Sequence, residues 1–580
     1  MMLASPEDFV KIRLGFMASS ELYEFGEFTL DASERRLSRK GQAVALEPKA
    51  HDVLVALLRR AGRLMTKRDL LDEVWPESFV EEGILAVHVS ALRRAMGDRE
   101  HRFIETVPRA GYRFVGAIHG VPEVRWSVAV LPAVPFSSGI LSGRDRSTGL
   151  ALTDHAIDRL GTFSQMIVRP TRAVREYLNV AGDPAAIGRS LRVDAVIDLH
   201  FFRSAERVRV SAALIRSRDG ALLWSGEFDE PATDLMRVAS TVARSAAAQL
   251  GSAADTDAPA RSTPRSAARP EVYELFGRGR SHLLASSMFE VEKAADAFRA
   301  AIELDPTYAA AHAGLALACC AQAWMRSRPP EDAYSEARSA ALRALAMDDS
   351  CADAQVALGA VLYFSEWNWS GAERSLKRAL QLNPNHTEAY LLYGQLLETL
   401  GHVEAGLGMK LKALERDPFS PLVHLQISLG YWNQRRYDEA IEWAKKTLEI
   451  DPRHPHAREN LAGAYWKKGD FDRQMEENIK HAELHGAPPA ALDHLKRIYA
   501  DGGHVGVMRL MLQQAAGLPA MQLAIIHGET GDLDNAFRHL DRALDGHDPS
   551  LVHLAIGPQW DSLRGDPRFG RCLTRMGLVA

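Results

Sequence analysis

The chain has 580 residues, more than a single hydrophobic core can organise, so we expect several domains. A hydrophobic fraction of 46% and a charged fraction of 25% are typical of a globular protein and exclude a fibrous or disordered chain. The formal net charge of -5 excludes a protein that coats nucleic acid through overall positive charge, so DNA binding would require a local basic patch.

Cysteine usage and hydropathy argue against metal sites and membrane spans. The cysteines form no C-x-x-C pair and lack tetrahedral zinc spacing, so we expect reduced thiols: Cys319, Cys320, Cys351 and Cys572. No run of about 18 or more apolar residues occurs, so no membrane span or membrane partner is expected. The first residues contain acids where a signal peptide would be basic, which predicts a cytoplasmic protein.

The first predicted domain spans residues 21–118. It opens with short alternating runs that predict a small antiparallel sheet. Pro48 should open a first helix, and Thr66 is a candidate N-cap for a second. A third helix is predicted over 82–96, followed by a two-stranded hairpin over 102–117.

The third helix has two distinct faces on a helical wheel. An apolar stripe should face the core: Leu85, Val89, Leu92 and Met96. The opposite face carries Val87, Ser90, Ala91 and Arg94, with His88 and Arg93 on its flanks. Over 88–115 basic residues outnumber acidic ones, so positive charge is concentrated in this part of the domain.

The sheet, three helices and hairpin, with the runs VHVSALRRAMGD (87–98) and IETVPRAGYRF (104–114), resemble the winged helix-turn-helix of OmpR/PhoB-type regulators. The resemblance implies that the third helix enters the major groove of double-stranded DNA and the hairpin reaches the adjacent backbone. The implied DNA-binding residues are Val87, His88, Ser90, Ala91, Arg93, Arg94, Arg109, Tyr112 and Arg113. Ser90 and Ala91 are short, so binding is expected to lean on phosphate contacts and DNA shape.

The loop between the second and third helices, residues 75–80, can face RNA polymerase in this family. The resemblance therefore makes Glu77, Ser78 and Phe79 candidates for polymerase contact, whereas Trp75 is expected to anchor the core. Members of the family often occupy direct DNA repeats as tandem dimers, so a homodimer is left open.

The second predicted domain spans residues 124–250, where strand-like and helical runs alternate as in an α/β sandwich. The runs LTDHAIDRL, RPTRAVREY, RVDAVIDLHF and GALLWSGEFD resemble the TolB N-terminal-like (FlgO-like) domain, which is not recognised as a catalyst. Its polar residues are therefore interpreted as scattered surface groups: Asp154, His155, Asp158, Arg169 and Asp194. Residues 251–270, rich in Ala, Ser, Pro and Asp, predict a flexible linker.

The third predicted domain, residues 271–580, is a repeat array. Pro384, Pro418 and Pro452 follow helix ends 34 residues apart, which is the tetratricopeptide period. The preceding interval, from Pro306 to Ser350, is longer by ten residues and predicts an extended loop at about 325–332. Later repeats degrade, and the closing run WDSLRGDPRFGRCLTRMGL should cap the array. Such a superhelix binds peptides or helices on its concave face, so a protein partner is expected.

No motif predicts catalysis, a cofactor or a metal. His481 and His485 have helical spacing, but the acid does not follow the first histidine as a zinc protease requires. The glycine-rich run 502–506 lacks the strand and lysine of a phosphate loop. An enzyme is therefore not expected.

The predicted architecture is multidomain, with α+β parts followed by an all-α part: a winged helix-turn-helix, a small α/β sandwich and an α-solenoid. The function that these parts favour is a transcriptional regulator that docks on promoter DNA and binds protein partners or effectors through its repeats. The alternative is a cytoplasmic scaffold whose winged helix mediates protein contacts.

Overall fold

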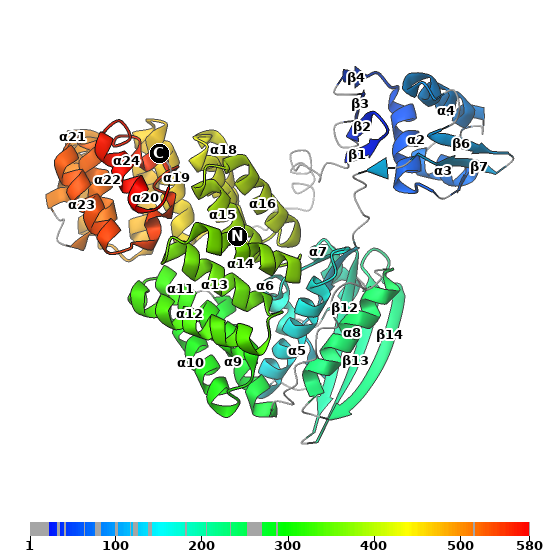
Figure 1. Cartoon of the computed structure of the whole chain (residues 1–580), viewed down its shortest axis with the longest axis horizontal. Helices are drawn as coiled ribbons and strands as arrows, with labels where there is room; N and C mark the ends of the chain where they lie inside the picture. Colours follow the sequence, from blue (N-terminus) through cyan, green and yellow to red (C-terminus); the bar gives the residue numbers. More distant parts are fainter. Residues whose placement is uncertain are drawn as a thin grey trace. The chain divides into compact units, whose positions relative to one another are not determined.

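The computed structural model divides the chain into two compact units, Met1–Arg125 and Trp126–Ala580. The described residues are 22–31, 35–39, 42–62, 64–75, 80, 83–98, 102–108, 110–116, 118–119, 126–136, 142–179, 182–204, 206–231, 234–251, 269–285, 288–513 and 517–578. In Figure 1 the first unit is blue, and the second runs from cyan to red. Across these ranges no helix combines the length and apolar character that a bilayer crossing needs.

The described part of the first unit combines two small antiparallel sheets with three helices. Its elements are β1 (Leu22–Phe25), β2 (Phe28–Asp31), β3 (Arg36–Arg39), β4 (Gln42–Val44), α2 (Pro48–Arg59), β5 (Met65–Thr66), α3 (Lys67–Val74), α4 (Gly83–Met96), β6 (Ile104–Val107), β7 (Gly111–Phe114) and β8 (Ile118–His119). One sheet has the order β4-β3-β2-β1-β8 and the other the order β5-β7-β6. The predicted winged-helix architecture is therefore confirmed.

Local signals set the ends of these helices. Pro48 is the first residue of α2, where its missing N–H costs no intrahelical hydrogen bond. The predicted N-cap Thr66 accepts a hydrogen bond from the Asp69 N–H at 3.1 Å, and the Asp69 carboxylate accepts from the Thr66 N–H at 3.2 Å. This capping box fixes the start of α3. Gly97, with a φ of 65°, ends α4 in the left-handed conformation that glycine adopts without strain.

An aromatic cluster joins the two sheets of the first unit. The Phe25 ring meets Phe114 and Phe103 edge-on, with centroid separations of 5.2 and 5.5 Å. Phe25 comes from the first sheet, whereas Phe114 comes from the second. Edge-to-face pairs add to the burial of apolar area, so the hairpin β6–β7 is held firmly on the rest of the unit.

The second unit begins with a sheet that has helices on both faces. Its elements are β9 (Trp126–Val130), β10 (Val134–Pro135), α5 (Gly143–Gly161), β11 (Met166–Val168), α6 (Thr171–Val174), the 3-10 helix η2 (Arg175–Asn179), α7 (Pro184–Ser190), β12 (Ala195–Arg203), β13 (Arg207–Arg216), β14 (Leu222–Pro231) and α8 (Leu235–Gln249). The order is β11-β9-β12-β13-β14, with β10 also on β12. Helices α5 and α8 cover one face, and α6 and α7 cover the other. This is the predicted α/β sandwich.

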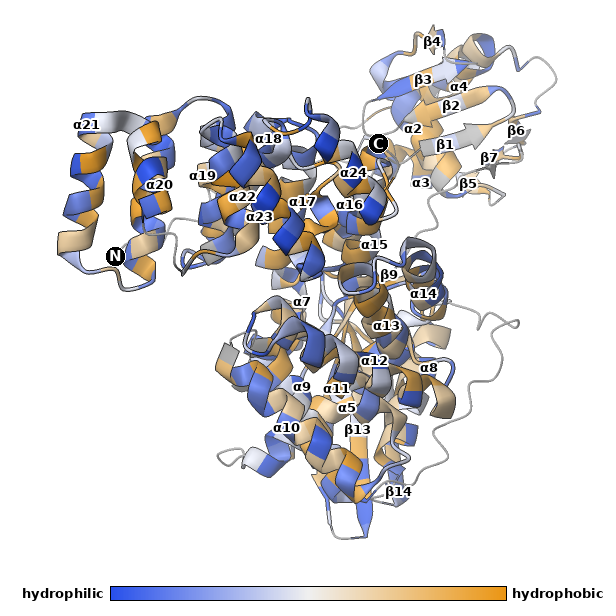
Figure 2. Cartoon of the chain, turned by 60° about the vertical axis from the view of Figure 1, so that its left-hand side comes forward, coloured by the Kyte–Doolittle hydropathy of each residue, from blue (hydrophilic) through white to orange (hydrophobic). Residues whose placement is uncertain are grey.

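The rest of the unit is a series of antiparallel helix pairs. They are α9 (Pro270–Ala285), α10 (Met288–Leu304), α11 (Ala309–Trp324), α12 (Pro330–Met347), α13 (Ala352–Phe364), α14 (Trp369–Leu382), α15 (Thr387–Thr399), α16 (Val403–Arg416), α17 (Pro421–Asn433), α18 (Tyr437–Ile450), α19 (Pro455–Lys467), α20 (Phe471–Leu484), α21 (Pro489–Gln513), α22 (Ala520–Glu529), α23 (Leu533–Asp545), η5 (Pro549–His553), η6 (Pro558–Trp560) and α24 (Pro567–Arg575). Paired helices cross closely at small residues: a Cβ on Gly406 would lie 2.5 Å from the Gly394 carbonyl oxygen. Inner helices are buried on most sides. One of them is α13, along which Figure 2 shows few hydrophilic residues. The predicted α-solenoid is confirmed.

The extended loop predicted at about 325–332 is wrong. The connection between α11 and α12 covers only 325–329, and most of the extra residues lengthen the two helices. Pro330 starts α12, and Glu331 and Asp332 lie in its first turn. A proline and acidic side chains are favourable at a helix N-terminus, so these residues extend the helix backwards.

The α/β sandwich packs directly on the repeats. Helices α5 and α9 cross so closely that a Cβ on Gly277 would lie 2.1 Å from the Ser147 carbonyl oxygen. Arg169, only 5% exposed, donates hydrogen bonds to the Glu415 and Arg416 carbonyls at 2.7 and 3.1 Å. The predicted linker 251–270 lies almost entirely outside the described residues.

This packing corrects the interpretation of the polar residues of the sandwich as surface groups. Asp154 is 8% exposed and pairs with Arg280 of α9 at 2.9 Å. Asp158 accepts a hydrogen bond from the Asn383 amide at 3.2 Å. These side chains, like Arg169, connect the sandwich to the array, because the face that carries them is covered by repeat helices.

Candidate nucleic-acid interface

Helix α4 presents one face to the core and the opposite face to solvent. The four residues of the predicted apolar stripe are between 0 and 3% exposed: Leu85, Val89, Leu92 and Met96. On the other side Val87 is 63% exposed, Ser90 and Arg94 are exposed, and Ala91 is half-buried. These four residues form one continuous surface, which we call the α4 outer face.

Arg94 is the cationic group of the α4 outer face. Among the described residues no acceptor or acid pairs with its guanidinium, whereas its neighbours Arg93 and Arg113 both have such partners. A guanidinium without an internal partner keeps all its donors for an incoming phosphate or base. Arg94 is therefore the side chain of α4 that is chemically best prepared to bind an anion.

Arg93 has a different role in the structure. Its Nη2 donates to the Ile104 carbonyl at 2.7 Å and to the Thr106 hydroxyl at 2.8 Å. Both acceptors belong to β6, so Arg93 connects α4 to the hairpin. It fixes the angle between the helix and the hairpin β6–β7.

Two of the predicted contact residues are buried. His88 is 9% exposed, and its ring lies 5.5 Å from that of Trp75, centroid to centroid. Tyr112 is 7% exposed in β7, opposite Met65 of β5. Helical spacing placed His88 at the edge of the outer face, but the indole covers it. Because neither side chain reaches the surface, we correct both predictions and assign these residues to the core.

The wing is the hairpin β6–β7. Arg113 is half-buried and its guanidinium lies 3.5 Å from Glu105 of the neighbouring strand, so part of its charge is compensated. The tip residue Arg109 lies outside the described residues. So do the candidates for polymerase contact, Glu77, Ser78 and Phe79. Trp75, predicted to anchor the core, is 9% exposed and does so.

Asp98 supports the interface in a role that was not predicted from the sequence. It is 1% exposed, and its carboxylate accepts hydrogen bonds from the Phe103 N–H at 3.2 Å and the Ile104 N–H at 3.1 Å. These bonds fix the start of β6 directly after α4. Because Asp98 is buried, its charge does not face a ligand of the outer face. The Gly97-Asp98 pair after the helix was the local signal for this role.

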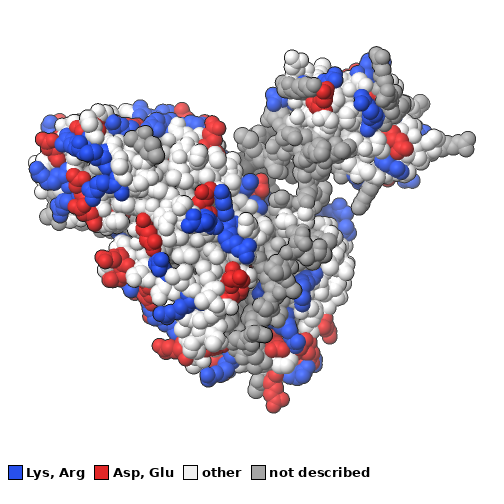
Figure 3. Space-filling model, in the orientation of Figure 1, with Lys and Arg blue, Asp and Glu red and all other residues white. Residues whose placement is uncertain are grey.

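Charge on the first unit is mixed. On the face visible in Figure 3, lysine and arginine side chains alternate with acidic ones, as the net charge of the chain suggested. DNA attraction would therefore come from the α4 outer face and the wing, and it would fall off within about 10 Å at moderate salt.

Comparisons with known proteins match two parts of the chain. Residues 41–114 match the family described as transcriptional regulatory protein, C terminal, and residues 368–421 and 425–478 match the tetratricopeptide repeat family. The transcriptional regulator HilA of Salmonella typhimurium is 32% identical over 171 residues, which are 28% of this chain and 30% of that protein. The transcriptional activator CadC of Escherichia coli is 31% identical over 113 residues, 19% of this chain and 22% of that protein.

A third relative is named as an enzyme. The putative adenylate cyclase 3 of Rhizobium meliloti is 28% identical over 191 residues, 33% of this chain and 32% of that protein. The chain thus spans about a third or less of each of these three relatives. What is shared is at the level of domains: the first unit carries an OmpR/PhoB-type DNA-binding domain, and the second carries tetratricopeptide repeats.

Proposed function

We propose that this protein is a transcriptional regulator that docks its winged helix on promoter DNA and binds other molecules through its second unit. The α4 outer face carries the proposal: a solvent-facing helix surface with an unpaired arginine, on a domain whose family consists of transcriptional regulators. Two relatives named as a regulator and an activator, HilA and CadC, support it. No enzymatic role is proposed.

In the proposed complex α4 lies in the major groove. Arg94 would bond to guanine or phosphate, and the exposed Val87 would contact a thymine methyl group. Ser90 and Ala91 are too short to reach far, so phosphate contacts and DNA deformability should supply much of the specificity. Arg113 and Arg109 of the wing are proposed to meet the backbone beside that groove.

Replacing Arg94 by alanine is expected to weaken binding to a selected duplex by about 1–3 kcal/mol, or roughly 5- to 150-fold in Kd, if Arg94 reads a base. If Arg94 contacts phosphate instead, the loss is smaller and the same for all sequences. The slope of log Kd against log salt concentration then decreases by about one. The measurement is a gel shift with the full chain and a duplex enriched from a random pool. Arg39→Ala is the control, because Arg39 lies on β3 and pairs with Glu27 at 2.8 Å. Equal binding by all three proteins would remove α4 from the interface.

The remaining assignments are proposals about partners. Contact of residues 77–79 with RNA polymerase, dimerisation on DNA, and a protein partner on the repeats follow from the domain types. That the sandwich is a TolB N-terminal-like domain is proposed on its sequence runs alone. A regulator that meets promoter DNA would work in the cytoplasm.

A further inference from the structure

The C-terminal end of the chain folds back on the earlier repeats. The Thr399 hydroxyl of α15 donates to the Val552 carbonyl of η5 at 2.9 Å, and the Trp369 indole of α14 donates to the Met576 carbonyl at 2.8 Å. An ion pair, Arg326–Asp548, adds a further connection at 2.9 Å. A superhelix of repeats usually leaves its concave face open to a partner. In this unit part of that face is occupied by the chain itself.

A large cavity lies between these parts. Its volume is about 2080 Å³, and its wall includes α5 and α6 of the sandwich, the inner helices of the repeats, and α22 and η5 of the C-terminal end. Typical small-molecule sites measure about 300–1,000 Å³, so the space exceeds that of most ligands. We call this space the chamber.

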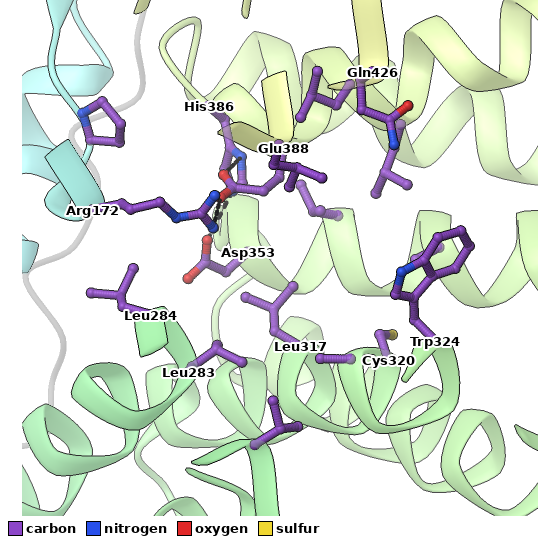
Figure 4. Close-up of a pocket in the computed structure, with 18 of the residues that line it drawn as sticks. Arg172, Leu283, Leu284, Leu317, Cys320, Trp324, Asp353, His386, Glu388 and Gln426 are labelled. Atoms are coloured by element: carbon purple, nitrogen blue, oxygen red, sulfur yellow. Dashed lines mark hydrogen bonds and ion pairs between the residues drawn. The ribbon is translucent and has the colours of Figure 1, made fainter. Parts of the chain in front are cut away.

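The chamber has an apolar wall and a polar wall. Figure 4 shows Leu283, Leu284, Leu317, Cys320 and Trp324 of α9 and α11 on one side. The other side presents Arg172, Asp353, His386, Glu388 and Gln426. A ligand that fits both walls has an apolar body and a polar edge.

The charged groups of the polar wall are paired with one another. The His386 Nε2 lies 2.9 Å from Asp353, and Arg172 lies 3.4 Å from Glu388. Arg280 reaches Asp353 at 3.2 Å as well as Asp154. A charged ligand would compete with these pairs and leave one partner, half-buried in the wall, without compensation, which costs free energy. The wall therefore favours a neutral ligand.

An amide on the polar wall has an unused hydrogen-bonding atom. The Gln395 Nε2 donates to the Gln426 Oε1 at 2.6 Å, while its own Oε1 is buried and, among the described residues, has no partner. Gln395 is 5% exposed and lines the chamber. An unpaired buried amide oxygen costs free energy unless a donor occupies the space in front of it. It marks a point where a ligand group would bind.

We propose that the chamber binds a neutral, largely apolar small molecule with one or a few hydrogen-bonding groups along one edge. An extended peptide fits less well, because η5 already occupies concave surface that a peptide would cover. The ligand would contact the sandwich, the repeats and the C-terminal end together, and so stabilise the packing of these three parts on one another. This ligand binding is a property of the second unit and does not rest on the proposed function.

The probe is N-phenyl-1-naphthylamine, a neutral apolar dye whose single N–H can donate a hydrogen bond to the Gln395 Oε1, titrated into the full chain without DNA. We expect a saturable rise in its fluorescence at a stoichiometry near one. Leu317→Trp and Ala321→Phe fill the chamber from the apolar wall and should each raise the Kd at least tenfold. Leu342→Trp on α12 is the control, because Leu342 is 42% exposed and does not line the chamber.

Circular dichroism identifies the variants that fold. Leu317→Trp adds less side-chain volume than Ala321→Phe, so it still tests the proposal if Ala321→Phe unfolds. Non-saturable dye binding by the wild type, or equal Kd values for all folded variants, would overturn the proposal. Displacement of the dye by a peptide pool but not by neutral small molecules would also overturn it. Because no DNA is present, none of these three outcomes bears on the proposed function of the first unit.

Discussion

Replacing Lys410 by methionine should destabilise the second unit by about 3–5 kcal/mol, because it leaves a buried carboxylate without its partner. Lys410 and Glu398 have side chains that are 1% and 0% exposed, and Nζ lies 2.7 Å from Oε1. The other Glu398 oxygen accepts a hydrogen bond from the Asn433 amide at 2.9 Å. Burial lowers the pKa of Lys410, and the carboxylate opposes this effect.

The double variant Lys410→Met/Glu398→Gln removes both charges and keeps an acceptor for Asn433, so most of the lost stability should return. Arg436→Met is the control, because Arg436 and Glu439 form a partly exposed pair at 2.6 Å and its loss should cost less than about 1 kcal/mol. Urea unfolding of the second unit, followed by far-UV circular dichroism, measures all three. A loss for Lys410→Met as small as that of the control would contradict the buried pair.

Gly111→Ala should have the largest effect in the first unit. A Cβ at this position would lie 1.9 Å from the Met65 carbonyl oxygen and 2.9 Å from the Thr66 Cα, and both atoms are backbone that cannot rotate away. Overpacking a dense site costs about 1–3 kcal/mol, and contact with backbone places this change at the upper end. The strand β7 must move off β5, so the wing shifts relative to α4 and DNA affinity should decrease at least tenfold.

Gly83→Ala is the matched control for stability. Gly83 begins α4, and nothing lies within 4 Å of an added Cβ, so no loss is expected. Thermal unfolding of the first unit compares the two variants. If the Gly111→Ala and Gly83→Ala variants have the same melting temperature, then the close contact between β7 and β5 does not exist.

The sequence predicted those features that have local causes. Pro48 and the Thr66–Asp69 capping box act within a few residues, and their helices begin where predicted. The 34-residue spacing of prolines reports the repeating helix pair directly. The apolar stripe of α4 follows from helical periodicity alone, and its four residues are buried.

The failures involve contacts between distant segments. His88 lies at the edge of a helical wheel, and only the position of Trp75 determines that it is covered. No local pattern indicates that Arg169 would donate to the Glu415 carbonyl, 246 residues later. The return of η5 to α15 is likewise a property of the whole superhelix. The chamber could not be predicted from the sequence, because its wall is formed by segments of the second unit that are far apart in the chain.

We propose above all that the α4 outer face binds duplex DNA. The most direct test is selection of duplexes by the full chain from a random pool, followed by titration of the enriched sequence at increasing salt. We predict a preferred sequence whose Kd rises steeply with salt and worsens with Arg94→Ala. Failure to enrich any duplex over competitor DNA at low ionic strength would contradict the claim and leave the protein as a scaffold.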